Sequence, residues 1–200
     1  MLKKSAFVMA LAVLAVGEPV MAAQQPVVTT VAVKHIRYHT ARPYANVKAD
    51  LEQKVGRLDE PIRKLLAEGK IDELRAALTK VAGGYGLVIH YVAVHGDWLI
   101  LNGGRRNGIV YHIGNVLTAV QMTRENFGAG LYAPLRLAIF EDGTGTTLEY
   151  DQPSSLLGQF HNAKIDQSAA SLNQRMARLV TDLCDGTRTA PPGVEGGSAK

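Results

Sequence analysis

The strongest constraint on the fold is a β-hairpin pattern over residues 133–150. Two runs of alternating residues, APLRLAIFE and TTLEY, flank the glycine-containing turn DGTG. A short glycine turn between two such runs is typical of paired antiparallel strands. Three apolar side chains are expected on one face of the first strand: Leu135, Leu137 and Ile139. A sheet with one apolar face requires other elements to cover that face.

Further strands and amphipathic helices follow from the same periodicity. Apolar and β-branched runs predict strands over residues 27–40, 87–94 and 109–113, with a short return strand from Trp98 to Leu101. Helical spacing of apolar residues predicts helices over residues 42–55, 57–82 (in two pieces), 116–126 and 166–183. The order of these elements predicts a single α+β domain over residues 27–183, with a mostly antiparallel sheet packed by helices on one face.

The N-terminus has the pattern of a secretory signal peptide. Two lysines precede an apolar run from Ala6 to Val16, and small residues follow up to Ala22 and Ala23. The run is shorter than the ~20 residues that a membrane-spanning helix needs. We therefore expect residues 1–23 to be cleaved after Ala22 or Ala23, leaving no transmembrane segment. The protein is then exported, to a bacterial periplasm.

Composition narrows the functional classes. The formal net charge is only +4, and the basic residues are dispersed, so nucleic-acid binding is not expected. The single cysteine, Cys184, has no partner for an internal disulfide and no neighbour that would activate its thiol. Residues 184–200 are rich in glycine and proline without apolar periodicity, which predicts a disordered tail.

A series of short motifs connects the chain to a known family. Gly-Asn ends one predicted strand, Pro-Leu-Arg opens the next, and an Asp-Gly turn and Tyr-Asp-Gln-Pro follow. In this order and spacing they resemble the bacterial and archaeal family called domain of unknown function 302, best over residues 85–160. The chain departs from the family at Val116, where the family has proline, and at residues 57–82, which look like a helical insertion. The resemblance implies a small α+β domain, often dimeric, with no established reaction.

The Gly114–Asn115 pair raises the question of a ligand, because it joins a predicted strand to a predicted helix. Free backbone N–H groups at a helix start can bind an anion, and Arg105, Arg106 and His112 lie just upstream. An asparagine in this position can instead cap its own helix, which occupies those donors. Both alternatives are open at this point. The family-like motifs suggest a ligand-binding set that converges in space: Gly114, Asn115, Arg136 and Tyr150.

Histidines in the strands offer an alternative function. His90, His95 and His112 lie in or beside apolar strands, and three imidazoles can ligate zinc, copper or haem iron. No standard metal or haem motif accompanies them, so the sequence requires no cofactor.

No catalytic constellation emerges from the sequence. There is no Gly-x-Ser-x-Gly elbow, no Ser-x-x-Lys pair and no phosphate-binding loop, and the acidic residues at the hairpin fit solvated turns. We therefore favour a non-catalytic module that binds a small, anionic ligand or assembles as a homodimer. The alternative is a metal- or haem-associated periplasmic protein.

Overall fold

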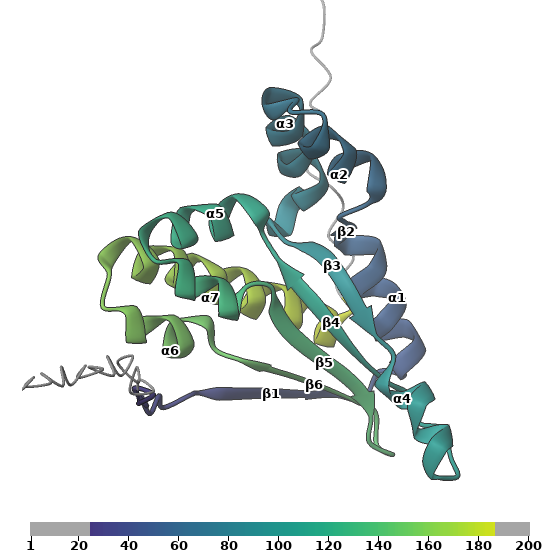
Figure 1. The fold of residues 1–200 in the computed structure, drawn as a ribbon. Helices are drawn as coiled ribbons and strands as arrows, with labels where there is room; N and C mark the ends of the chain where they lie inside the picture. The colour runs from purple at the N-terminus through teal and green to yellow at the C-terminus, as the bar shows by residue number, and fades with distance from the viewer. Residues whose placement is uncertain (1–24, 187–200) are drawn as a thin grey trace, which may run out of the picture. The chain divides into compact units, whose positions relative to one another are not determined.

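Residues 25–186 are described by the computed structural model, and a six-stranded sheet organises them (Figure 1). The strands are β1 (His35–Thr40), β2 (Gly56–Arg57), β3 (Val88–Ala93), β4 (Gly108–Gly114), β5 (Leu135–Glu141) and β6 (Thr146–Asp151). They lie in the order β1-β6-β5-β4-β3-β2, and only the short pair β2–β3 is parallel. Residues 25–30 form no helix or strand and belong to a separate unit from the domain, which begins at Val31. The predicted α+β class and mostly antiparallel sheet are confirmed.

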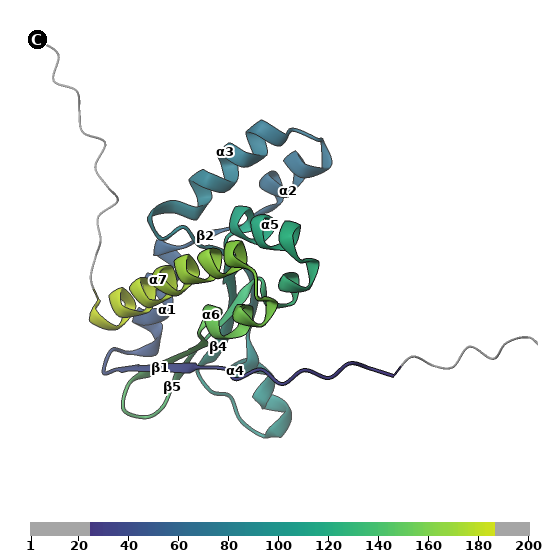
Figure 2. The same cartoon turned by 90° about the vertical axis from the view of Figure 1, so that its left-hand side faces the viewer.

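The helices connect the strands and pack against one another. They are α1 (Tyr44–Lys54), α2 (Glu60–Ala67), α3 (Ile71–Ala82), α4 (His95–Trp98), α5 (Val116–Glu125), α6 (Pro153–Leu157) and α7 (Ala163–Asp185). Four short 3₁₀ helices join them: η1 (Gly83–Tyr85), η2 (Leu99–Asn102), η3 (Phe127–Tyr132) and η4 (Gly158–Phe160). The long helix α7 packs beside both α5 and α6 (Figure 2).

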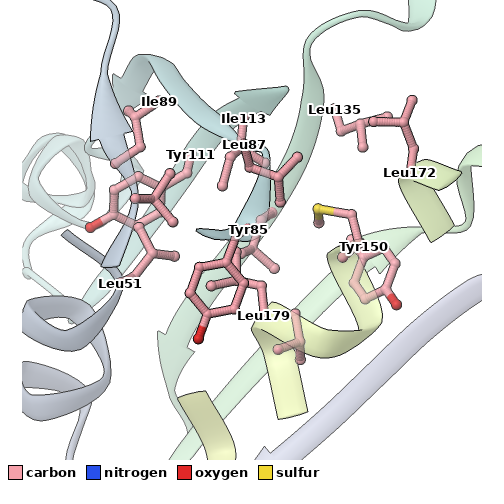
Figure 3. Close-up of a cluster of buried hydrophobic side chains, with 14 of the residues drawn as sticks. Leu51, Tyr85, Leu87, Ile89, Tyr111, Ile113, Leu135, Tyr150, Leu172 and Leu179 are labelled. Atoms are coloured by element: carbon pink, nitrogen blue, oxygen red, sulfur yellow. The ribbon is translucent and has the colours of Figure 1, made fainter. Parts of the chain in front are cut away.

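The core lies between one face of the sheet and the helices. Leu135, Leu137 and Ile139 are buried on this face, as the hairpin pattern predicts. Helix α7 contributes buried residues at helical spacing: Ile165, Ala169, Leu172, Met176, Leu179, Val180 and Leu183. Figure 3 shows side chains from β4 and α7 in the same cluster. Each large side chain buried in this way contributes ~1.5–3 kcal/mol of hydrophobic stabilisation.

One strand prediction is wrong over part of its length and another over all of it, because within residues 25–186 no strand pairs with these segments. Residues 27–34 are not a strand, because β1 pairs only as far as the end of β6. Beyond the β1–β6 pairing, the Gln152 N–H donates a backbone hydrogen bond to the Lys34 carbonyl. After Gln152 the chain leaves the sheet and begins α6. Residues 98–101 belong to α4 and η2, where the backbone bonds are local, from Gly103 N to Ile100 O.

The helix predictions are confirmed with small changes of boundary. The segment 57–82 forms α2 and α3, and helix 116–126 forms α5. Helix α7 extends to Asp185, so that Cys184 lies within it. The predicted signal peptide and residues 187–200 of the predicted tail lie outside the described residues. Within residues 25–186, no helix has the length and apolar character needed to cross a bilayer.

Candidate ligand-binding site

A pocket of about 210 Å³ lies beside α5 at the end of the sheet where β4 stops. Most of its wall is apolar. The lining residues are His90, Gly114, Asn115, Val116, Ala119, Val120, Met122, Thr123, Tyr132, Ala133, Pro134, Leu135 and Leu172. The pocket therefore combines segments that are far apart in the sequence.

Gly114 keeps one end of this pocket open. A Cβ at this position would lie 3.4 Å from Pro134 Cα and 3.7 Å from His90 Nε2. These are ordinary contact distances, so a side chain there would occupy the space beside Pro134 and His90. The glycine at the end of β4 thus shapes the cavity.

Asn115 uses its side chain to fasten the start of α5. Its Oδ1 accepts a hydrogen bond from Thr118 N at 2.9 Å, which is the N-cap of the helix. Its Nδ2 donates to the Gly86 carbonyl at 2.9 Å, and Arg175 Nη1 donates to the same oxygen at 3.1 Å. Of the two alternatives that the sequence left open, the structure shows capping. Asn115 therefore joins β4, α5, α7 and the turn before β3.

His90 brings a buried polar atom to the wall of this pocket. It lies where the register of β3 against β4 shifts, between Ile89 and Tyr91, and such irregularities re-aim a side chain. Within residues 25–186, its Nε2 is buried and has no hydrogen-bond partner. Burial lowers the pKa of His90 below its ordinary value of 6.5, and the charges of Arg63 and His112 lower it further. The ring is therefore neutral at pH 7.

The lowered pKa of His90 predicts a loss of stability in mild acid. The His90 imidazole binds a proton more readily in the unfolded chain than in the folded chain. The contribution of His90 to the free energy of unfolding is therefore complete above about pH 6.5. It is lost as the pH falls from there through the folded pKa. We expect His90→Leu to lose less unfolding free energy than the wild type between about pH 7.5 and pH 5, measured by urea denaturation.

His35 provides a control of opposite sign. A hydrogen bond with Asp151 raises the pKa of His35, so its contribution is present in acid and is lost as the pH rises. His35→Asn is therefore expected to lose more stability than the wild type on acidification, by a small amount because the side chain is exposed. Equal slopes for the wild type and His90→Leu would contradict the assignment of His90.

The four residues predicted to form one site do not line one pocket. Gly114 and Asn115 line the pocket beside α5, but Arg136 alternates with Leu135 and Leu137 and is exposed on the opposite sheet face. Tyr150 is buried in the core, where burial raises its pKa to about 12. Successive side chains of the hairpin strands point to opposite faces of the sheet. Tyr150 therefore lies on the core face and Arg136 on the other face.

The upstream basic residues do not reach the start of α5 either. Arg105 and Arg106 precede β4, whereas Asn115 follows it, so about 20 Å of extended strand separates them. His112 lies on the opposite face from the core, with its ring 5.5 Å from the ring of Tyr91. Among these three residues, the two arginines therefore lie beyond the other end of β4 from Asn115, and His112 faces away from the core.

The three histidines proposed as metal ligands lie in three different surroundings. His90 lines the pocket beside α5, His112 packs against Tyr91, and His95 begins α4 and lines a separate hollow. In the part of the chain that the structure describes, no three His, Cys, Asp or Glu side chains are placed to hold a metal ion. We do not carry the metal alternative forward.

A comparison with protein families agrees with the motifs that frame this pocket. The family described as "Domain of unknown function DUF302" matches residues 62–183, more than half of the chain. The chain belongs to the DUF302 family. The match includes most of segment 57–82, which the motif comparison treated as an insertion, as well as all of the pocket's lining residues.

A solved structure supports the fold of this DUF302 chain. The crystal structure of an uncharacterized conserved DUF302 protein from Bacillus stearothermophilus aligns with a TM-score of 0.53 and 16% sequence identity. The alignment covers 75% of this chain and 97% of that one. None of the curated proteins matches the chain. At this identity the likeness extends to the fold alone.

Several lining residues of the DUF302 pocket were missed from the sequence. Ala119, Val120 and Thr123 look like ordinary positions of an amphipathic helix, and Leu172 reads as core. No local signal distinguishes them, because their role depends on which distant segment lies opposite. His90 was singled out, but for a metal rather than for this pocket.

Proposed function

We propose that this DUF302 chain is an exported, non-catalytic module that binds a small neutral molecule in the pocket beside α5. The observation that carries the proposal is the Nε2 of His90, which lies at the wall of a mostly apolar cavity and has no hydrogen-bond partner among residues 25–186. A buried polar atom without a hydrogen bond costs ~1–3 kcal/mol, so a ligand that bonds to it recovers that free energy. Export is proposed from the signal-peptide pattern of residues 1–23.

The size and lining of the pocket limit the ligand. At about 210 Å³ it is smaller than the ~300–1,000 Å³ of pockets that hold drug-sized molecules, so the ligand is correspondingly small. Among the residues that the structure describes, no lysine or arginine lines the pocket, and His90 is uncharged at neutral pH. Asn115 is already engaged on both sides of its amide. These features favour a neutral, mostly apolar molecule with one hydrogen-bonding group over the anion first considered.

The test is mass spectrometry of the full chain produced with its own leader and purified from the periplasm. The native spectrum is expected to exceed the mass of the chain by a small adduct that is absent from the denatured spectrum. Ala119→Phe, which fills the pocket from α5, is expected to abolish the adduct. Ala170→Phe is the control, because Ala170 is exposed on α7 away from the pocket lining.

Each outcome of this experiment bears on a separate part of the proposal. A native mass equal to that of the bare chain would contradict a retained ligand and leave water as the partner of His90. An adduct kept by a folded Ala119→Phe variant would place the ligand elsewhere. The denatured mass reports whether residues 1–23 are removed, and hence whether the chain is exported.

Assembly as a homodimer is the second candidate, and a hollow on the other sheet face favours it. This hollow, of about 250 Å³, has mostly apolar walls. Its lining residues are His95, Gly96, Leu99, Arg106, Asn107, Gly108, Ile109, Val110, Ala138 and Phe140. Tyr91, on the same face, is 63% exposed. Apolar surface of this kind is a common feature of subunit contacts. The same native spectrum decides between one chain and two.

A further inference from the structure

The protonation of one ring nitrogen determines which ligands the pocket beside α5 can bind. The Nε2 of His90 lies 3.7 Å from where a Cβ would stand on Gly114, the last residue of β4. Within residues 25–186 this atom is buried and has no hydrogen-bond partner. A neutral imidazole carries its single N–H on one of two nitrogens, so Nε2 is either a donor or an acceptor.

The other ring nitrogen of His90 leaves this choice open. In the described part of the chain, His90 forms no side-chain hydrogen bond, and Nε2 is its only nitrogen that is both buried and unpartnered. Nδ1 is therefore in reach of water, which can accept a hydrogen bond from it or donate one to it. The position of the proton depends on the surroundings of Nε2.

The start of α5 favours a lone pair on Nε2. Gly114 directly precedes Asn115, the N-cap of this ten-residue helix. The aligned peptide dipoles give the first turn of a helix a positive potential. That potential stabilises the lone pair of a nearby nitrogen and opposes an N–H, whose hydrogen is itself positive. The proton of the neutral ring is accordingly on Nδ1, and Nε2 presents an acceptor to the pocket.

An acceptor at this position selects a hydroxyl group as its partner. An aliphatic amine would be charged at pH 7, and a positive charge is disfavoured beside a helix N-terminus. A hydroxyl is neutral, and it accepts as well as donates. Val116, the first residue of α5, lines the same pocket, and the N–H of a first helical residue has no acceptor within its own helix.

The apolar part of the pocket has room for one substituted six-membered ring. An apolar cavity of ~150 Å³ is enough to hold benzene, and this pocket measures about 210 Å³. Leu135 and Leu172 face one another across it from β5 and α7 (Figure 3). Val120 lines the pocket and is 58% exposed, so the cavity reaches the surface there. An aromatic ring also raises the acidity of its hydroxyl, to a pKa of ~10, which makes it a better donor while it stays neutral at pH 7.

We propose that the ligand of this pocket is a monocyclic phenol whose hydroxyl donates a hydrogen bond to Nε2 of His90. This inference rests on the proposed function, because it names the class of molecule bound in the same pocket. The ring occupies the apolar space beside α5, and Gly114 leaves the approach to Nε2 open.

Three matched compounds test the donor. They are p-cresol, which donates and accepts, 4-methylanisole, which only accepts, and 4-fluorotoluene, which has the same ring and methyl group without a hydroxyl. The protein purified from the periplasm is dialysed and titrated with each compound by calorimetry. Wild-type protein is expected to bind p-cresol at least roughly fivefold more tightly than either of the others, as one additional hydrogen bond provides. Nitrogen-15 NMR of the free protein should show the His90 proton on Nδ1.

Two variants assign the effect to Nε2 and to the pocket. His90→Leu removes the acceptor and is expected to bind p-cresol and 4-fluorotoluene alike. Ala119→Phe fills the pocket and is expected to bind none of the three compounds. Ala170→Phe is again the control, because Ala170 is exposed on α7 and should leave all three affinities unchanged.

The results distinguish a wrong ligand class from a wrong site. Equal affinities for all three compounds, lost in Ala119→Phe, would overturn the phenol and support the pocket. Tighter binding of 4-methylanisole than of p-cresol would show that Nε2 is a donor. A preference for p-cresol that survives in His90→Leu would place the hydroxyl elsewhere. Failure of all three to bind, with a mass adduct on the native chain, would overturn only the phenol, whereas absence of the adduct would contradict the proposed function itself.

Discussion

Replacing Leu137 by alanine is expected to lower the free energy of unfolding by ~2–5 kcal/mol. Leu137 lies in β5, between β4 and β6, and its side chain is completely buried. Its register partner on β4 is Tyr111, which is equally buried. Truncating a leucine in such a place removes its apolar contacts and leaves a cavity that the neighbours fill only in part. Urea denaturation followed by circular dichroism measures the change.

The neighbouring position provides the control for this prediction. Arg136 is on the same strand but exposed on the other face, so Arg136→Ala is expected to change stability by no more than ~0.5 kcal/mol. A similar loss of unfolding free energy for both variants would contradict this arrangement, in which one face of β5 is in the core and the other is in solvent. The Arg136 variant should also bind the pocket ligand normally, because Arg136 does not line that pocket.

Asn115→Ala is expected to cost ~2 kcal/mol, the second largest effect. About half of this comes from losing the N-cap of α5, since the Thr118 N–H is left without its acceptor. The remainder comes from losing the donor to the Gly86 carbonyl, which keeps only its bond from Arg175. The same denaturation measurement applies.

Asn126 is a matched asparagine cap with a simpler role. Its Oδ1 accepts a hydrogen bond from Gly128 N at the start of η3, in an exposed position. Asn126→Ala is therefore expected to cost less than Asn115→Ala, toward the lower end of ~0.5–2 kcal/mol. If the two variants were equally stable, Asn115 would not act as the joint between α5 and the turn before β3.

The joint at Asn115 explains why a family-like motif can be structural rather than catalytic. Gly114 and Asn115 end one strand, begin one helix and bond to the turn at Gly86. Binding, in our proposal, uses the space that this joint leaves open between Pro134 and His90. The side chain of Asn115 then acts on the ligand only by positioning α5.

The sequence by itself determined the strands and helices that are buried on one face, because burial of one face produces a regular spacing of apolar residues. Leu135, Leu137 and Ile139 alternate because one face of β5 is covered, and α7 repeats its apolar residues every three to four positions for the same reason. The sequence also offered the helix cap at Asn115, as an alternative to an anion site, because capping depends on the local residue type. The resemblance to the DUF302 family rested on short motifs in these same segments.

Only the tertiary structure decided the features that depend on neighbours. The apolar runs 87–94 and 98–101 look alike in sequence, but the first contains β3, which pairs with β4, whereas the second pairs with no strand in the described part of the chain. The extent of β1 was set by the length of β6. The pocket exists because His90, Ala119 and Leu172 meet across long sequence distances. Such contacts arise from packing between elements, which no local periodicity encodes.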